Sequence, residues 1–185
     1  RTLADNYLGG ILADDMGLGK TLQAIVYMAS IKKISPNNQF LIVCPSSLIY
    51  NWQDEIENFA PGLITEVITG NPKERQDLIE SNIPKDVLIT SYPLIRRDFK
   101  YYEVINFHTV FIDEAQFIKN ADSLNAKSVK LIKAAHKFAL TGTPIENSLS
   151  ELWSIFDFIM PDYLLTHNKF VNQFEKPIIK EQEGI

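Results

Sequence analysis

Residues 14 to 21 read Asp-Asp-Met-Gly-Leu-Gly-Lys-Thr, between a short apolar run at 10 to 13 and a helix-like run at 22 to 28. A strand, a glycine-bearing loop, Lys-Thr and a helix form the layout of a phosphate-binding loop. Glycine lets the backbone wrap closely around an anion, and the N–H groups at the helix start point at the phosphates. A strict Walker A pattern has glycine where Asp14 stands. The pattern alone therefore allows either a coincidental match or a subfamily with a loop of its own.

The composition indicates one globular domain. The chain has 185 residues, of which 45% are hydrophobic, so it is long enough to bury a core. No apolar run is long enough to span a membrane, and the single cysteine, Cys44, excludes an internal disulfide. We expect a cytoplasmic protein without a membrane partner, associated with the nucleoid if it is prokaryotic. Its net charge of −5 means that any nucleic-acid site is local or is completed by other parts.

Short β-like runs alternate with helical ones along the chain, which predicts a mostly parallel sheet with helices on both faces. The fold class is therefore α/β, with three layers. Strands are expected at 10–13, 40–44, 63–68, 87–90, 109–112 and 137–140. Helices are expected at 20–32, 47–59, 73–80, 123–134 and 148–159. Ser148 and Glu151 form a capping-box pair before the last helix, and Lys130, Lys133 and Lys137 are expected to form a solvated face.

A second chemical signal is an apolar strand, Val110-Phe111-Ile112, followed by Asp113 and Glu114. In a nucleotide site the first acid would hold Mg²⁺ and the second would orient or deprotonate the attacking water. Taken alone, the two acids could equally cap the following helix. With Lys20 and Thr21 after an earlier strand, we interpret them as one nucleotide site, because the carboxyl ends of parallel strands meet at one edge. Lys20 would reach the β- and γ-phosphates, and the hydroxyl of Thr21 would ligate Mg²⁺.

Hydroxyl side chains follow three other strands. Ser46 follows the run at 40–44, Thr90 ends the run at 87–90, and Ser91 follows it. Such groups can bond a nucleic-acid backbone without reading its sequence, although helix capping is the simpler interpretation. The turn at 141–144, Thr-Gly-Thr-Pro, could sense the γ-phosphate through Gln116, or could be a tight turn before a helix.

In order and wording, these segments resemble the Swi/Snf family of helicase-like ATPases in helicase superfamily two. Residues 12 to 21 match the family's first motif, Leu-Ala-Asp-Glu-Met-Gly-Leu-Gly-Lys-Thr, except that Asp15 replaces glutamate. The family also carries aspartate at the position of Asp14, which accounts for the missing glycine. The other matching segments are Pro45, Ser46, Asn51 and Trp52 for segment Ia, Thr90-Ser91-Tyr92 for segment Ib, Asp113 to Gln116 for the acidic box, and Leu140 to Pro144, extended to Trp153, for segment III. Gln116 replaces the usual histidine of the box, a variant that resembles bacterial and archaeal members.

The resemblance implies the N-terminal RecA-like lobe of a P-loop NTPase at residues 1–161, with an extension of the same lobe at 162–185 and a second lobe outside this chain. It implies ATP and Mg²⁺ as cofactors, and double-stranded DNA and DNA-bound proteins as partners. Members translocate on duplex DNA and remodel bound proteins without separating the strands. The fragment is expected to be monomeric and nearly inactive alone, since the second lobe would supply arginine fingers.

The resemblance also assigns roles to residues. Catalysis is assigned to Lys20, Asp113, Glu114 and Gln116. Nucleotide binding is assigned to Asp14, Met16, Gly17, Leu18, Gly19, Lys20, Thr21 and Leu22, and Mg²⁺ binding to Thr21 and Asp113. Coupling of hydrolysis to movement is assigned to Gln116, Thr141, Gly142 and Thr143, and contact with the DNA backbone to Ser46, Thr90 and Ser91.

Three other classes of protein fit these residues less well. DEAD-box RNA helicases share the lobe, but they carry Ser-Ala-Thr where this chain has Thr-Gly-Thr at 141–143, and they lack the Asn-Trp of segment Ia. A non-enzymatic interaction lobe is disfavoured by the intact Lys20, Thr21, Asp113 and Glu114. A switch GTPase is disfavoured because its guanine-reading Asn-Lys-x-Asp signature is not evident.

Overall fold

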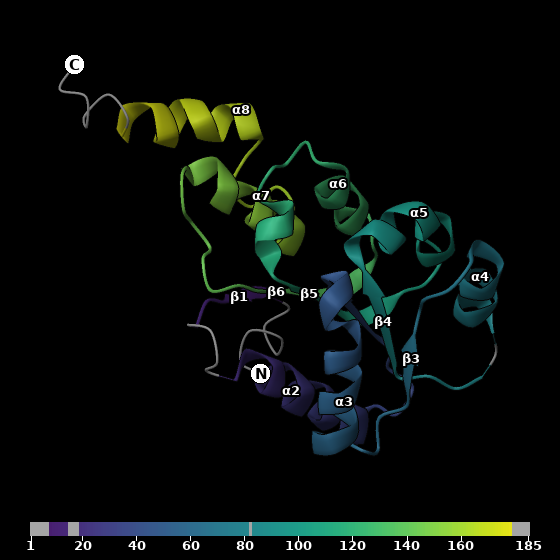
Figure 1. Ribbon diagram of the computed structural model, residues 1–185. Coiled ribbons are helices and arrows are strands. Elements are labelled where there is room, and N and C mark those ends of the chain that lie inside the picture. Colours follow the sequence, from purple (N-terminus) through teal and green to yellow (C-terminus); the bar gives the residue numbers. More distant parts are fainter. Residues whose placement is uncertain (1–7, 15–18, 82, 179–185) are drawn as a thin grey trace.

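The computed structural model describes residues 8–14, 19–81 and 83–178, and these build a six-stranded sheet with helices on both faces (Figure 1). The strands are β1 (Gly10–Leu12), β2 (Phe40–Cys44), β3 (Thr65–Val67), β4 (Val87–Ser91), β5 (Phe107–Asp113) and β6 (Ala134–Leu140). Their order is β1-β6-β5-β2-β4-β3, and every neighbouring pair is parallel. The predicted three-layer α/β fold is confirmed.

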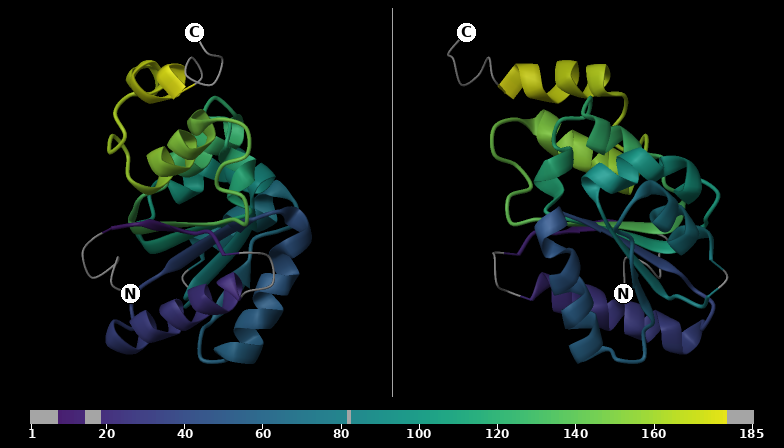
Figure 2. Two further views of the ribbon diagram at one scale, coloured as in Figure 1. Left: turned by 90° about the vertical axis from the view of Figure 1, so that its left-hand side faces the viewer. Right: turned by 45° about the vertical axis from the view of Figure 1, so that its right-hand side comes forward.

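The helices divide between the two faces of the sheet (Figure 2). They are α2 (Lys20–Ile34), α3 (Ile49–Phe59), α4 (Pro72–Glu80), α5 (Tyr92–Tyr102), α6 (Leu124–Lys130), α7 (Leu149–Ile159) and the short α8 (His167–Phe170). Helices α2 and α3 pack on one face, and α4 to α7 pack on the other. Two 3₁₀ turns, η1 (Ser46–Leu48) and η2 (Ala115–Ile118), follow β2 and β5, and a π-helical turn, η3 (Val171–Glu175), follows α8.

The central strand β2 shows why the sequence folds this way. All five of its residues are buried, as expected of a parallel strand covered on both faces. Successive side chains point to opposite faces. Phe40, Ile42 and Cys44 therefore pack with α2 and α3, whereas Leu41 and Val43 pack with the helices of the other face.

Helix α6 is shorter than the sequence predicted. The prediction ran to residue 134, but the helix ends at Lys130, and Ala134 already belongs to β6. Ala134 pairs with Phe107 of β5, and the Phe107 N–H donates to the carbonyl of Lys133 at 3.1 Å. Sheet pairing thus overrides the helical pattern of the last turn. Lys137, expected on a solvated face, instead lies buried on β6, where its ammonium group donates to the Lys130 carbonyl at 2.9 Å.

Helix α5 was not predicted. Its buried positions follow helical spacing, but one of them is the acid Asp98, which interrupts the apolar stripe. Asp98 is buried because it accepts two hydrogen bonds from Arg75 of α4, at 2.6 and 2.9 Å. A buried acid with a partner 23 positions away leaves no local signal in the sequence.

The capping box was predicted at the wrong helix. Ser148 precedes α7 but makes no side-chain capping bond, and the Glu151 carboxylate accepts from the Glu146 N–H of the preceding loop. A complete capping box forms before α4, where Asn71 accepts from the Glu74 N–H and the Glu74 side chain accepts from the Asn71 N–H. Pro72 in the first turn also favours this helix start.

The end of the described chain packs against α7. The Trp153 indole donates to the Leu165 carbonyl at 3.1 Å, and its ring lies 4.8 Å from that of His167 in α8. The division of the chain at residue 161 stays a prediction, and so does a loose tail at 180–185, which lies outside the described residues. Among the described residues, no helix is both long and apolar enough to cross a membrane.

Candidate nucleotide site

The phosphate-loop motif leads directly into helix α2. Gly19 immediately precedes the helix, with φ 78° and ψ 28°, a left-handed conformation that favours glycine. Lys20 and Thr21 form the first turn of α2 and contribute N–H groups at the positive end of the helix dipole. Met16, Gly17 and Leu18, also predicted to bind nucleotide, lie outside the described residues.

Asp14 lies across the loop from α2 and contacts it twice. Its carbonyl accepts a hydrogen bond from the Lys20 ammonium group at 2.7 Å, and its carboxylate accepts one from Gln23 at 3.1 Å. Both groups of Asp14 therefore hold the two ends of the loop together. This contact gives the aspartate a structural use at the position where Walker A has glycine.

Asp113 ends strand β5 and lies at the carboxyl edge of the sheet. The Trp52 indole of α3 donates to one of its oxygens at 2.9 Å, and the Glu114 N–H donates to the other at 2.9 Å. Burial raises the pKa of the Asp113 carboxyl, and these two hydrogen bonds oppose the rise. Trp52 is thus a direct partner of the acid that the sequence assigned to Mg²⁺.

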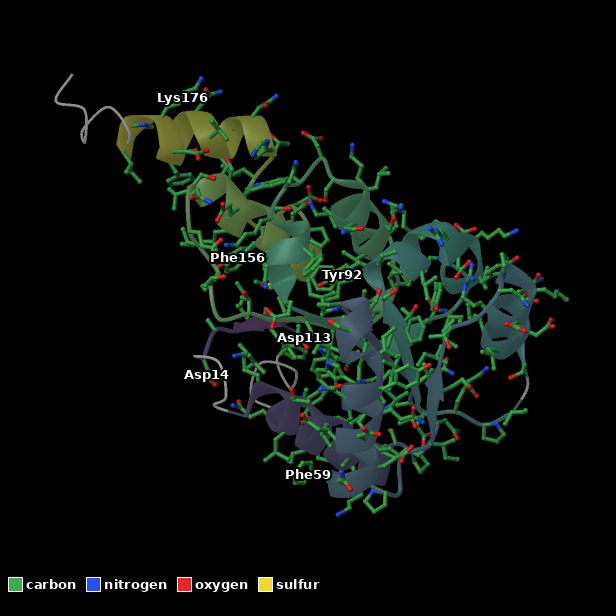
Figure 3. The ribbon with its side chains drawn as sticks, viewed as in Figure 1. Asp14, Phe59, Tyr92, Asp113, Phe156 and Lys176 are labelled. Atoms are coloured by element: carbon green, nitrogen blue, oxygen red, sulfur yellow. The ribbon has the colours of Figure 1, made fainter. Side chains whose placement is uncertain are left out.

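The backbone of Asp113 is also fixed. The Tyr92 hydroxyl, at the start of α5, donates to the Asp113 carbonyl at 2.7 Å, and Figure 3 shows the two residues near one another. The Tyr92 ring stacks on Phe117 of η2, with centroids 5.2 Å apart. The acidic segment is therefore held by helices α3 and α5, one on each face of the sheet.

Glu114 adopts a left-handed backbone conformation, with φ 51° and ψ 59°. For a residue with a side chain this conformation is uncommon, and it occurs often at functional sites. Its carboxylate accepts a hydrogen bond from the Gln116 side chain at 2.7 Å. Its side chain makes no capping hydrogen bond to η2, so Glu114 is not a side-chain cap of that turn.

Gln116 links the acids to the turn after β6. Its side-chain oxygen accepts from the Thr141 hydroxyl at 3.3 Å, and that hydroxyl accepts from the Thr143 N–H at 3.1 Å. The residues predicted to couple hydrolysis to movement thus form a continuous chain of contacts from Glu114 to Thr143. Gly142, the fourth of them, lies between Thr141 and Thr143 in the same turn.

A groove of about 500 Å³ brings the predicted phosphate and acidic residues together. Its lining residues are Gly19, Lys20, Thr21, Leu22, Leu48, Glu55, Phe59, Asp113 and Glu114. A lysine and helix N–H groups on one side face carboxylates on the other, which is the arrangement that phosphoryl transfer requires. Glu55 of α3 also lines the groove, and burial together with the nearby Asp113 raises the pKa of its carboxyl.

The oxygen donors of this groove fit Mg²⁺. Each oxygen of Asp113 accepts one hydrogen bond, from Trp52 or from the Glu114 N–H, and keeps a further lone pair, and Thr21 lines the same groove. In the part of the chain that the structure describes, no three acidic, histidine or cysteine side chains could hold a metal by themselves. Mg²⁺ fits such a site because it is usually held by one or two protein oxygens together with phosphates and water.

The family model of the SNF2-related domain matches residues 1–185 of this chain. The chain belongs to the SNF2-related domain family. The resemblance drawn from the motifs is confirmed.

This SNF2-related domain is 47% identical over 180 residues to an uncharacterized ATP-dependent helicase of Mycoplasma genitalium, covering 95% of this chain and 17% of that protein. It is 41% identical over 184 residues to the TATA-binding protein-associated factor MOT1 of Saccharomyces cerevisiae, covering 93% of this chain and 10% of that protein. Among solved structures, the Sulfolobus solfataricus SWI2/SNF2 ATPase core in complex with dsDNA matches with a TM-score of 0.86 and 36% identity, covering 97% of this chain and 37% of that chain. The chain thus spans less than half the length of each relative.

The three residues predicted to contact DNA differ in exposure. Ser46, in η1, is exposed at the carboxyl edge of β2. Thr90 and Ser91 end β4 with exposed fractions of only 0% and 1%. Neither Ser46 nor Ser91 makes a side-chain helix cap. Contact of any of them with DNA stays a prediction, and for Thr90 and Ser91 it would require a local rearrangement.

Sequence reasoning on the SNF2-related domain missed three residues of the site. Trp52 and Tyr92 were quoted as parts of segments Ia and Ib, but no role was given to either. Glu55 lies three positions after Trp52, so the two lie on neighbouring positions of one face of α3. The helical spacing between Trp52 and Glu55 is the sequence signal that could have placed Glu55 near the site.

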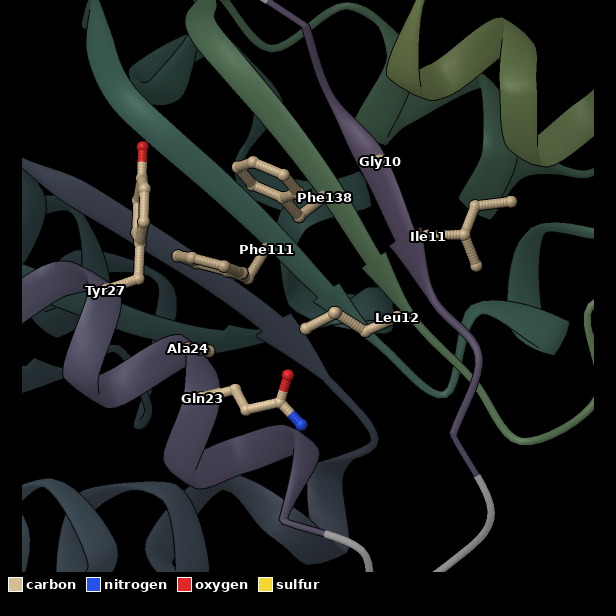
Figure 4. A pocket seen from close by; sticks show the side chains of 8 residues that line it. All are labelled: Gly10, Ile11, Leu12, Gln23, Ala24, Tyr27, Phe111 and Phe138. Atoms are coloured by element: carbon tan, nitrogen blue, oxygen red, sulfur yellow. The ribbon is translucent and has the colours of Figure 1, made fainter. Parts of the chain in front are cut away.

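A smaller cavity of about 140 Å³ lies under the edge strand β1, next to the site (Figure 4). Tyr27 of α2 meets the rings of Phe111 and Phe138 edge-on, with centroids 5.9 and 5.6 Å away. Gln23, which contacts Asp14, lines this cavity as well. Its lining is mostly apolar, which sets it apart from the polar groove that holds the lysine and the acids.

Proposed function

We propose that this domain is the ATP-binding lobe of a Swi/Snf-type ATPase that depends on DNA, translocates on double-stranded DNA and remodels protein–DNA complexes. The observation that carries the proposal is the groove in which Lys20 and Thr21 face Asp113 and Glu114. Membership of the SNF2-related family supports it, as does the likeness to an ATPase core in complex with dsDNA.

In this proposal four side chains of the groove, those of Lys20, Thr21, Asp113 and Glu114, have a task each. Lys20 and the N–H groups at the start of α2 bind the phosphates, because both present positive charge there. Thr21 and Asp113 hold Mg²⁺, which neutralises charge on the phosphate oxygens when it is bound. Glu114 orients the attacking water and accepts its proton.

We further propose that Gln116, Thr141, Gly142 and Thr143 report the state of the nucleotide to the rest of the motor. Their support is the unbroken chain of contacts from Glu114 through Gln116 and Thr141 to the Thr143 N–H. Ser46 is the exposed candidate for contact with the DNA backbone. Because the net charge is −5, the remaining DNA contacts would come from other parts of the protein.

The test is ATP hydrolysis by the full-length protein with and without double-stranded DNA. Lys20→Ala is expected to abolish nucleotide binding. Glu114→Gln is expected to retain binding but to lower kcat by roughly 10² to 10⁴, the usual contribution of a general base. Lys33→Ala is the matched control, since Lys33 is an exposed lysine at the far end of the same helix.

The outcome also separates the alternatives. Stimulation by RNA instead of duplex DNA would favour a DEAD-box-like activity, and no hydrolysis by the unmodified full-length protein would favour an interaction lobe. We expect the 185-residue chain alone to hydrolyse ATP slowly, because an arginine finger supplied from outside contributes roughly 10³ to 10⁵ in rate. Strong DNA-stimulated turnover by this chain alone would contradict that expectation.

A further inference from the structure

Glu151, in the first turn of α7, accepts hydrogen bonds from the loop that precedes this helix. Its carboxylate accepts from the Glu146 N–H at 2.9 Å, from the Asn147 N–H at 3.3 Å and from the Asn147 side chain at 3.0 Å. Burial raises the pKa of this carboxyl, but the hydrogen bonds from Glu146 and Asn147 and the nearby ammonium group of Lys119 outweigh burial and bring the pKa to about 2. Glu151 is therefore ionised near neutral pH, with the loop folded around it.

Lys119, directly after η2, connects this loop to the acidic segment. Its side chain is only 9% exposed, and its ammonium group lies 2.8 Å from the Glu146 carboxylate and 3.2 Å from that of Glu151. The two glutamates differ, since Glu146 is about half exposed and only Glu151 accepts from the loop backbone. Lys119 and Glu151 therefore join η2 to the start of α7.

The segment from Thr141 to Glu151 thus meets the acidic segment at both of its ends. At its start, the Thr141 hydroxyl reaches Gln116 over a long bond of 3.3 Å. At its end, Glu151 pairs with Lys119, and nearby the Ser154 hydroxyl donates to the Ile118 carbonyl at 2.6 Å. The ion pairs of Lys119 and the 2.6 Å hydrogen bond of Ser154 thus lie at the Lys119 end of the segment, and the neutral 3.3 Å contact with Gln116 lies at its start.

We propose that Lys119 and Glu151 are positioning residues that hold the Thr141–Glu151 loop in place over η2, and that this placement is needed for DNA to stimulate ATP hydrolysis. The second half rests on the proposed function, whereas the first concerns the structure alone. Neither residue lines the nucleotide groove. Their effect therefore passes through the Gln116–Thr141 contact and not through the phosphates.

The first test measures amide hydrogen exchange in the full-length protein. In Glu151→Gln the Glu146 and Asn147 amides are expected to exchange faster, because the charged acceptor is lost. Lys119→Met, which leaves Glu151 in place, is expected to act in the same direction. Asp77→Asn is a control that removes an exposed carboxylate from a surface ion pair on α4. Unchanged exchange of both amides in both variants would overturn the positioning role.

The second test measures steady-state ATP hydrolysis by the same proteins with saturating duplex DNA. Glu151→Gln is expected to lower the stimulated kcat roughly tenfold while KM for ATP changes by less than about twofold. Glu146→Gln is the matched control on the same loop, and a much smaller loss is expected. Thermal melting of each variant serves as a check on folding. A variant that is partly unfolded would show a lower apparent kcat both with and without DNA, because less of the protein is active.

The two proposals fail in different ways. If the unmodified full-length protein shows no DNA-stimulated hydrolysis, the proposed function is wrong. The positioning role of Lys119 and Glu151 is then still tested by amide hydrogen exchange. If the unmodified protein is stimulated and Glu151→Gln is stimulated equally, the link between this loop and DNA stimulation is overturned. Equal losses in Glu146→Gln and Glu151→Gln would also contradict it, because only Glu151 holds the loop backbone.

Discussion

At the scale of single residues, the hydrogen bond from the Trp52 indole affects Asp113, the acid that we propose holds Mg²⁺. Trp52 is buried, and its N–H donates to Asp113 at 2.9 Å. Trp52→Phe keeps a ring but removes the donor, so the pKa of Asp113 is expected to rise further. A hydrogen bond to a charged group contributes about 1.5–3 kcal/mol, and we expect a loss of that size in the free energy of unfolding. We also expect the ATPase of the full-length protein to need more Mg²⁺, as a Mg²⁺ titration would show.

Trp153→Phe is the matched control for this substitution. Trp153 is also buried, but its indole donates to the Leu165 carbonyl, away from the groove. Trp153→Phe is expected to lower the free energy of unfolding without changing the Mg²⁺ concentration that the ATPase requires. A shift of the Mg²⁺ requirement in both variants, or in neither, would show that the contact between Trp52 and Asp113 does not prepare the acid.

The buried ammonium group of Lys137 is expected to make the free energy of unfolding depend on pH in the alkaline range. Burial lowers the pKa of its ammonium group from 10.5 to about 8. Between these two values the unfolded chain binds more protons than the folded chain, so the free energy of unfolding rises with pH over that interval. Below pH 8 the cost of burying the charge is fully present, and it amounts to about 3 kcal/mol.

Lys137→Met is therefore expected to stabilise the chain at pH 7. The net gain is about 2 kcal/mol, since the lost hydrogen bond to the Lys130 carbonyl costs about 1 kcal/mol. The gain should disappear as the pH approaches 10.5, which urea unfolding at several pH values would reveal. Lys133→Met, at an exposed position nearby, should show no such trend. A gain from Lys137→Met that is the same at pH 7 and pH 10 would contradict the assignment.

At the scale of elements, a buried ion pair joins α4 to α5. Arg75 and Asp98 have exposed fractions of 4% and 3%, and they share two hydrogen bonds. Asp98→Asn leaves the guanidinium buried without its charge partner, which is expected to cost about 3–5 kcal/mol. The ion pair between Lys73 and Asp77 on the same helix is exposed to water, so Asp77→Asn should lower the free energy of unfolding far less. Urea unfolding compares the two variants, and equal costs would refute the structural reasoning.

The elements also show where sequence reasoning succeeds and fails. Strands such as β2 were predicted with their bounds because parallel strands are apolar along their whole length. Helix α5 was missed because the acid on its buried face is neutralised by a residue of another helix. The capping box at Ser148 failed because Glu151 found stronger partners in the loop before it. Local patterns thus fail where a distant partner changes what a side chain prefers.

At the scale of the whole molecule, the parallel sheet explains why the candidate site could be predicted at all. Residues at 20, 113 and 141 are far apart in sequence, but each lies at or after the carboxyl end of a strand, and all these strand ends lie at one edge. The side-chain contacts within that edge could not be predicted. Trp52 reaches Asp113 across 61 positions, and only the packing of α3 on the sheet brings them together.

The strand that precedes the phosphate-loop motif, β1, is a short edge strand of the sheet. Strand β1 has three residues and lies at the edge of the described sheet, with β6 as its neighbour. One further hydrogen bond, from the Thr141 N–H to the Leu12 carbonyl at 3.1 Å, ties the turn after β6 to the backbone two positions before Asp14. A force applied to the turn at 141–144 would therefore reach the backbone next to Asp14 through this hydrogen bond, without passing through the hydrophobic core. We therefore expect that the backbone next to Asp14 can shift together with that turn while both layers of helices stay packed.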